Sequence, residues 1–96
     1  MTMYAAILYL TFPAERHAEV AAFLVDDMGA VIRDNAGFVD FRVLDGGRAG
    51  ELVIMDTWER REDSAAASAK PEAVAVHERY TALGIAVAKA DRYEVL

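Results

Sequence analysis

The side chains that could transfer protons are few and scattered. Asp56 stands in the largely apolar run ELVIMDTW, residues 51 to 58. A carboxylate in such a strand either meets an arginine or a backbone donor, or has its pKa raised and can act as a base. His17 and His77 are further candidate bases, because imidazole exchanges protons near neutral pH; the alternative for each is a histidine on a helix surface. No metal site is predicted, because the spacing of these three residues resembles no ligand motif.

Apolar and aromatic residues could form a chamber around these groups. Side chains alternate along a strand, so Ile54, Asp56 and Trp58 share one face, and a pocket lined by Trp58 would also receive Asp56. Core packing explains Trp58 equally well. On a later helix, His77 borders the apolar face that carries Tyr80. We therefore take Ile54, Trp58 and Tyr80 as candidate substrate-binding residues, with Asp56, His17 and His77 as candidate catalytic residues.

The elements that must position these residues follow from periodicity and turn signals. A strand, a long amphipathic helix, two strands joined by a glycine-rich turn, two helical segments and a last strand are predicted, over residues 3–12, 13–35, 38–45, 51–58, 59–70, 71–84 and 92–96. This order is that of the ferredoxin-like βαββαβ arrangement, an α+β fold with a four-stranded antiparallel sheet and its helices on one face. We treat residues 1–96 as a single domain.

The strands carry more apolar side chains than one sheet face needs. Residues 3–12 and 51–58 are apolar on both faces, and an exposed face of this kind is unusual in a monomer. A symmetric homodimer, with two sheets packed face to face, is therefore predicted. Asp40 and Arg42 are the polar exception, and could pair across that interface or lie at its rim.

Composition excludes several classes of partner. The 96 residues carry 16 acidic and 10 basic side chains, a formal charge of −6, which argues against a nucleic-acid-binding surface. The absence of cysteine favours the cytoplasm. The apolar start, residues 1–12, lacks a basic region and is too short to span a bilayer, so no membrane contact is expected.

Several short motifs together carry a family resemblance. Gly37 opens the second strand, Trp58-Glu59 closes the third, and a helix of small residues ends at Ser68-Ala-Lys-Pro71. This pattern resembles the antibiotic biosynthesis monooxygenase family, whose fold is the dimeric α+β barrel. The resemblance implies a pocket between sheet and helices, oxygenase chemistry on quinols or phenols, and neither metal nor flavin. It also places Trp58 on the family's commonest pocket position.

The resemblance implies a simple reaction. A deprotonated, electron-rich aromatic can pass an electron to oxygen itself, so the protein needs only a base, a donor for the developing oxyanion and an apolar chamber. Quinone-forming members of the family carry an Asn four residues before the Trp and a Tyr six after it, where this chain has Ile54 and Ser64. Haem-degrading members pair an Asn of the first strand with a His in the helix that follows the Trp. Here the first strand has no Asn, and the corresponding helix reads Ala65-Ala66-Ala67-Ser68.

Two functions therefore remain open. The first is a small cofactor-independent monooxygenase that acts on an aromatic or polyketide-type metabolite, with Trp58 as a wall and Asp56, His17 or His77 as base. The second is a non-catalytic dimeric module of the same fold, which binds a ligand or serves as a scaffold. An open pocket that contains Asp56 and a histidine favours the first, whereas a space filled by side chains would exclude it.

Overall fold

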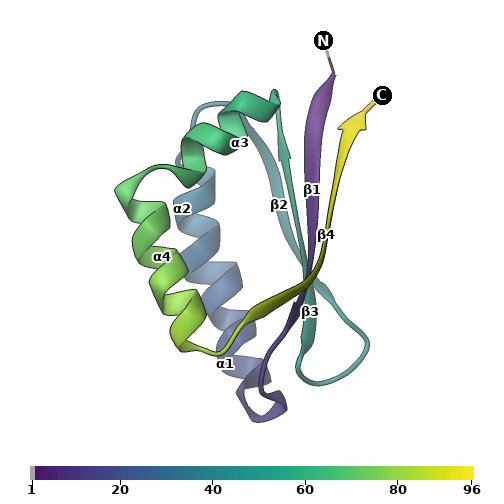
Figure 1. Ribbon diagram of the computed structural model, residues 1–96, viewed down its shortest axis with the longest axis vertical. Helices are drawn as coiled ribbons and strands as arrows, with labels where there is room; N and C mark the ends of the chain where they lie inside the picture. Colours follow the sequence, from purple (N-terminus) through teal and green to yellow (C-terminus); the bar gives the residue numbers. More distant parts are fainter. Residues whose placement is uncertain (1) are drawn as a thin grey trace.

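The computed structural model describes residues 2–96, in which one antiparallel sheet is covered on one face by helices (Figure 1). The strands are β1 (Met3–Thr11), β2 (Phe38–Asp45), β3 (Glu51–Trp58) and β4 (Ala86–Val95), in the order β2-β3-β1-β4. The helical segments are η1 (Ala14–Arg16), α1 (His17–Ala22), η2 (Phe23–Met28), α2 (Gly29–Arg33), α3 (Arg61–Ser68) and α4 (Pro71–Ala82). The predicted ferredoxin-like fold is confirmed.

The long helix predicted after Pro13 is a run of four segments. A 3-10 turn, η1, leads into α1, and the π-helix η2 separates α1 from α2. Its buried residues, Val20, Phe23 and Leu24, face the sheet. Beyond the last turn, the Asn35 side-chain amide donates to two of the helix's final carbonyls at 2.8 and 3.0 Å. These bonds satisfy carbonyl groups that a helix end leaves without partners.

The hairpin of β2 and β3 has the predicted bounds, but β2 contains a bulge. Its register against β3 slips by one residue between Phe38 and Asp40, which leaves Val39 as an extra residue. Simple alternation would group Val39 with the buried Phe41, but Val39 is 42% exposed, and Phe38 packs against the core instead. A bulge resets the alternation of the strand, and strand periodicity alone does not reveal it.

The last strand is longer than predicted. It begins at Ala86 rather than at Arg92, because Ala-rich residues of low strand propensity pair with β1 along its whole length. In this register Arg92 lies opposite Ala6 and Tyr93 opposite Ala5. Arg92 therefore shares the helix-covered face with Ala6, whereas Tyr93 lies on the other face.

The face of the sheet that carries no helices in Figure 1 is rich in apolar side chains. Met3, Tyr9, Leu44 and Tyr93 are 39%, 36%, 42% and 54% exposed there. Asp40 accepts a 2.7 Å hydrogen bond from the Arg42 guanidinium, so these two residues pair within the chain. The Arg42 bond holds the pKa of the Asp40 carboxyl below its usual value.

The core between sheet and helices is divided into two clusters of buried side chains. The larger is centred on Leu10, Leu24 and Ile54, and the smaller contains Trp58 and Ala67. No helix among residues 2–96 is long and apolar enough to cross a membrane. The two clusters leave an open space between them, and that space is the candidate functional site.

Candidate active site between sheet and helices

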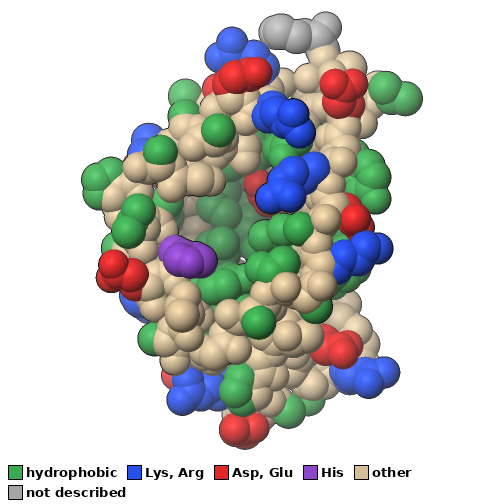
Figure 2. All heavy atoms as spheres, in the orientation of Figure 1, with side chains coloured by type: hydrophobic (Ala, Val, Ile, Leu, Met, Phe, Trp, Pro, Cys, Tyr) green, Lys and Arg blue, Asp and Glu red, His purple; other side chains and the backbone are tan. Residues whose placement is uncertain are grey.

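A pocket of about 450 Å³ lies between the two core clusters. Strands β1, β3 and β4 form its floor, and α2, α3 and α4 form its walls. Figure 2 shows its mouth as a hollow with hydrophobic side chains inside. The small residues of α3 that line it, Ser64, Ala67 and Ser68, leave room for a ligand. The volume is within the range of small-molecule sites.

Asp56 and Trp58 form a fixed pair on the pocket floor. The Trp58 indole Nε1 donates a 2.6 Å hydrogen bond to Asp56 Oδ2, and both residues line the pocket. Trp58 is only 2% exposed, and its ring meets Phe38 edge-on at 5.9 Å. Burial raises the pKa of Asp56, while the Trp58 bond and the charge of Arg92 oppose the rise. The carboxyl thus has both a donor partner and a raised pKa, the two outcomes that the sequence left open.

Two further residues that line the pocket from the helical side each carry a buried polar atom without a protein partner among residues 2–96. The Tyr80 hydroxyl and Asn35 Oδ1 are buried and accept or donate no hydrogen bond within residues 2–96. Burial raises the pKa of Tyr80 to about 12, so its hydroxyl stays protonated near neutral pH and can donate a hydrogen bond. His77, at the exposed rim, stacks on the Tyr80 ring with centroids 5.6 Å apart.

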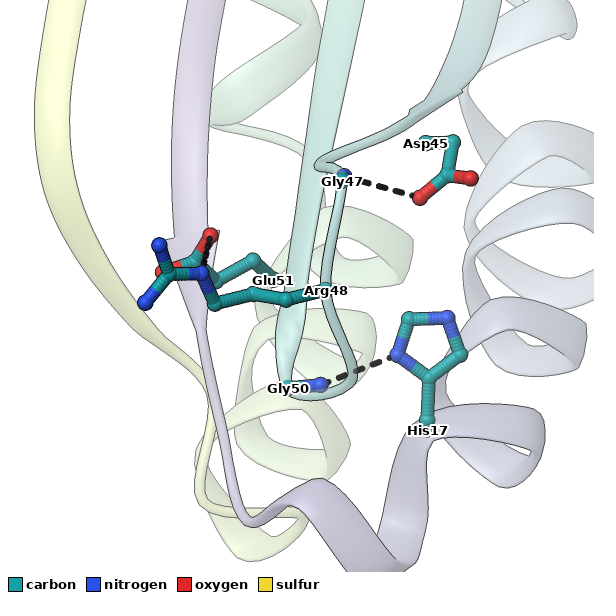
Figure 3. A network of polar contacts seen from close by, with 6 residues as sticks. All are labelled: His17, Asp45, Gly47, Arg48, Gly50 and Glu51. Atoms are coloured by element: carbon teal, nitrogen blue, oxygen red, sulfur yellow. Dashed lines mark hydrogen bonds and ion pairs between the residues drawn. The ribbon is translucent and has the colours of Figure 1, made fainter.

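His17 does not belong to this pocket. Its Nδ1 accepts a 3.0 Å hydrogen bond from the Gly50 backbone N–H (Figure 3). Its ring packs on Phe12 with centroids 5.6 Å apart. His17, one of the candidate bases, is not among the residues that line the pocket with Asp56. It stands at the start of α1, where it joins that helix to the loop between β2 and β3. Helix periodicity placed it on the apolar stripe but could not say which end of the sheet it meets.

Arg92 is the pocket residue that sequence reasoning missed. Asp56 and Arg92 both pair with Ala6, so the acid, the alanine and the guanidinium lie in one row across β3, β1 and β4. Alternation along β4 shows that Arg92 and Tyr93 point to opposite faces of the sheet, but it does not show which of the two faces the helices.

The described residues contain no group of three or more His, Cys, Asp or Glu side chains that could hold a metal ion.

The order of the strands, the helices on one face and the pocket between them define a ferredoxin-like α+β protein. The family is equally clear, because the family model for antibiotic biosynthesis monooxygenases matches residues 3–79. The chain belongs to this family. The resemblance inferred from Gly37, Trp58-Glu59 and Pro71 is thereby confirmed.

Solved structures agree with this fold at low sequence identity. HapK from Hahella chejuensis is 13% identical, with a TM-score of 0.83 over 97% of this chain and 92% of HapK. Rv0793 from Mycobacterium tuberculosis is 15% identical, with a TM-score of 0.77 over 98% and 95%. SnoaB from Streptomyces nogalater, a cofactor-independent oxygenase, is 15% identical, with a TM-score of 0.73 over 100% and 93%. No curated protein matches the chain.

Proposed function

We propose that this protein is a cofactor-independent monooxygenase that acts on an aromatic or polyketide-type metabolite held between sheet and helices. The observation that carries the proposal is the Asp56 carboxyl, hydrogen-bonded to Trp58 and desolvated in an open, largely apolar pocket. Membership of the monooxygenase family and the fold shared with SnoaB support it. The monooxygenase hypothesis required an open pocket rather than a space filled by side chains, and the pocket is open and is lined by both Asp56 and His77.

Each residue of the pocket has a defined task in this proposal. Asp56 Oδ2 is engaged by Trp58, so Oδ1 is the oxygen that accepts a proton from an acidic C–H of the substrate. The Tyr80 hydroxyl donates to the substrate oxygen on which the negative charge develops. Ile54 and Trp58 supply apolar walls that exclude water from the resulting anion. His77, at the rim, is the alternative base.

The chemistry balances with dioxygen as the second reactant. The deprotonated ring carbon transfers one electron to O₂, and the carbon radical and superoxide combine to form a C–O bond. Protonation gives a hydroperoxide. Loss of the second hydrogen from that carbon then breaks the O–O bond, so that a CH₂ group and O₂ become a C=O group and water. No electron from outside is needed, and Asp56 returns to its starting state by releasing its proton to the peroxide.

Oxygen uptake with a panel of anthrones and dihydroxy-aromatics tests this function. Asp56→Asn keeps an oxygen that accepts the Trp58 bond but removes the base, so uptake should fall at least about 100-fold, the usual contribution of a general base. In the wild type, the rate should fall as the pH drops through the raised pKa of Asp56, because only the ionised carboxylate accepts a proton. Arg48→Gln, in the loop far from the pocket, is the matched control. Wild-type protein that consumes no oxygen with any substrate would refute the proposal.

The second candidate function is a ligand-binding module without catalysis. Ile54 and Ser64, both in the pocket, stand where quinone-forming relatives are expected to carry Asn and Tyr. A protein that binds the panel compounds with the same affinity in wild-type and Asp56→Asn forms, and consumes no oxygen, would be such a module. The absence of cysteine fits action in the cytoplasm in either case.

We further propose that the functional unit is a homodimer joined through the bare sheet face. Ile7, Val53 and Met55 lie at the centre of that face, with Tyr9 and Tyr93 exposed beside them. A second copy would cover these apolar side chains in an isologous interface. The inward pockets remain separate, so each subunit keeps its own Asp56 and Trp58.

A further inference from the structure

We propose that the substrate carries a carboxylate on its aromatic framework, and that Arg92 binds this carboxylate at the mouth of the pocket. The inference rests on the proposed small-molecule function and narrows its substrate class. It is carried by three observations: the row of Asp56, Ala6 and Arg92, the free guanidinium, and a second hollow that Arg92 shares with the pocket.

The row sets the distance between the reacting end and the recognising end. Because neighbouring strands lie about 4.8 Å apart, the Cα atoms of Asp56 and Arg92 are separated by about 10 Å across Ala6. The small side chain of Ala6 leaves the floor between them open. A flat aromatic of about two rings could lie over Ala6, with its reacting carbon at Asp56 and its substituent at Arg92.

The Arg92 guanidinium is available for a ligand. It forms no ion pair and no side-chain hydrogen bond with any of residues 2–96, although it lies on the inner face of an exposed edge strand. A guanidinium presents parallel N–H donors that match the two oxygens of a carboxylate. In a chain of net charge −6, a free arginine on the lining of an apolar pocket points to an anionic ligand.

The surroundings of Arg92 reinforce its charge. A hollow of about 500 Å³ adjoins the pocket, and Arg92 lines both. Arg60 and Arg61 line this hollow against the acids Glu62 and Glu94. Figure 2 shows Lys or Arg side chains beside the mouth of the pocket itself. Arg60 is paired with Asp63 at 3.4 Å, so Arg61 is the further cation beside Arg92 that can attract an anion to the mouth.

Asp56 determines which end of the ligand is charged. An ionised Asp56 repels a carboxylate, so the ligand's acid group lies at the Arg92 end and its neutral, reacting end faces Asp56. The same repulsion predicts that Asp56→Asn binds an aromatic carboxylate more tightly than the wild type does, with no gain for a neutral ligand. This coupling links the recognising arginine to the proposed base.

The test compares 2-naphthoate with its neutral amide, 2-naphthamide, which has nearly the same shape. Binding is measured by calorimetry, and the indole N–H NMR signal of Trp58, the one tryptophan of the chain, reports whether the ligand enters the pocket. We expect naphthoate to bind about tenfold more tightly than naphthamide, as a charge-assisted bond exceeds a neutral one. Raising the salt concentration from about 20 mM to about 0.5 M should reduce this preference.

Variants assign the preference to one side chain. Arg92→Gln should lower the naphthoate preference to about one while naphthamide affinity stays within about twofold. Arg92→Lys, which keeps the charge but loses the paired donors, should restore part of it. Arg48→Gln, far from the pocket, should leave it unchanged.

Three results would overturn the inference: equal affinities in the wild type, an equal loss for both ligands in Arg92→Gln, or no shift of the Trp58 signal with either ligand. Failure of the enzymatic proposal is separate. A protein that prefers naphthoate through Arg92 but consumes no oxygen would retain this inference and lose the monooxygenase function.

Discussion

Replacement of Tyr80 by Phe should stabilise the protein and impair its activity at once. The Tyr80 hydroxyl is buried and has no hydrogen-bond partner within residues 2–96, while its ring is 6% exposed and belongs to the larger core cluster. Phe keeps the ring, its packing and its stacking on His77. The substitution therefore isolates the contribution of one oxygen atom.

The magnitude follows from what the hydroxyl costs the folded state. Burial of a hydroxyl without a hydrogen bond costs about 1–3 kcal/mol in proteins, so Tyr80→Phe should raise the free energy of unfolding by about 1–2 kcal/mol. In a domain of this size, each kcal/mol corresponds to about 4–8 °C in melting temperature. Oxygen uptake should fall about 100-fold, because the oxyanion of the reaction loses its donor.

A dependence on pH gives the same prediction a second readout. Burial raises the pKa of Tyr80 from 10.0 to about 12, so the folded protein favours the neutral phenol. This contribution to stability is complete below pH 10 and is lost as the pH rises from 10 towards 12. The advantage of Tyr80→Phe over the wild type should therefore widen across that window.

Urea unfolding followed by circular dichroism measures both effects, with Tyr93→Phe as the matched control. Tyr93 is 54% exposed on the other face of the sheet, so its hydroxyl should change the stability by less than about 0.5 kcal/mol. A Tyr80→Phe variant that is less stable than the wild type would show that the hydroxyl has a partner in the folded protein, and would refute the reasoning.

Two other predictions concern the frame of the site. A Cβ at Gly37, where φ is +79°, would clash with the Asp63 carboxylate, so Gly37→Ala should destabilise the protein by more than about 1 kcal/mol. In the double variant, Asp63→Ala should relieve the clash with the new Cβ but leave the backbone strain at residue 37. A double-mutant cycle of unfolding free energies separates the two effects, and strictly additive effects of the two substitutions would contradict the clash. Met55→Glu, at the centre of the bare sheet face, should convert a dimer into monomers in sedimentation experiments. A wild-type monomer at micromolar concentration would exclude that interface.

Local sequence patterns predicted most of the fold because, in most elements, the side-chain periodicity and the turn residues agree with the structure that forms. The hairpin bounds followed from alternation and a glycine-rich turn, and the start of α4 followed from Pro71. The start of β4 could not be predicted in this way, because its alanines have little strand propensity and are held in the sheet by their pairing with β1. The bulge at Val39 and the six-residue π-helix η2 are local irregularities, which average periodicity does not detect.

The candidate site was predicted only where one strand determined it. Alternation brought Ile54, Asp56 and Trp58 to one face, and all three line the pocket. Arg92 was missed for a physical reason. In the Tyr-Glu-Val-Leu tail the apolar side chains would be expected to face the helices, yet Tyr93 faces away and Arg92 faces in. A sheet with two apolar faces removes the usual rule for which side is inward.

The π-helix η2 determines how straight the inner wall of the helix layer runs. Apolar residues recur every four positions at Val20, Leu24, Met28 and Ile32, and in an α-helix such a row drifts sideways by about 40° at each step. The wider turn of η2 takes up part of that drift, so one row extends from the core at Val20 to the pocket at Ile32. Deletion of one residue within η2 would let this turn wind as an ordinary α-helix and would shorten the wall of the pocket by one residue. The shape of the cavity can thus be altered by the length of one helix, with the sheet and its acid left unchanged.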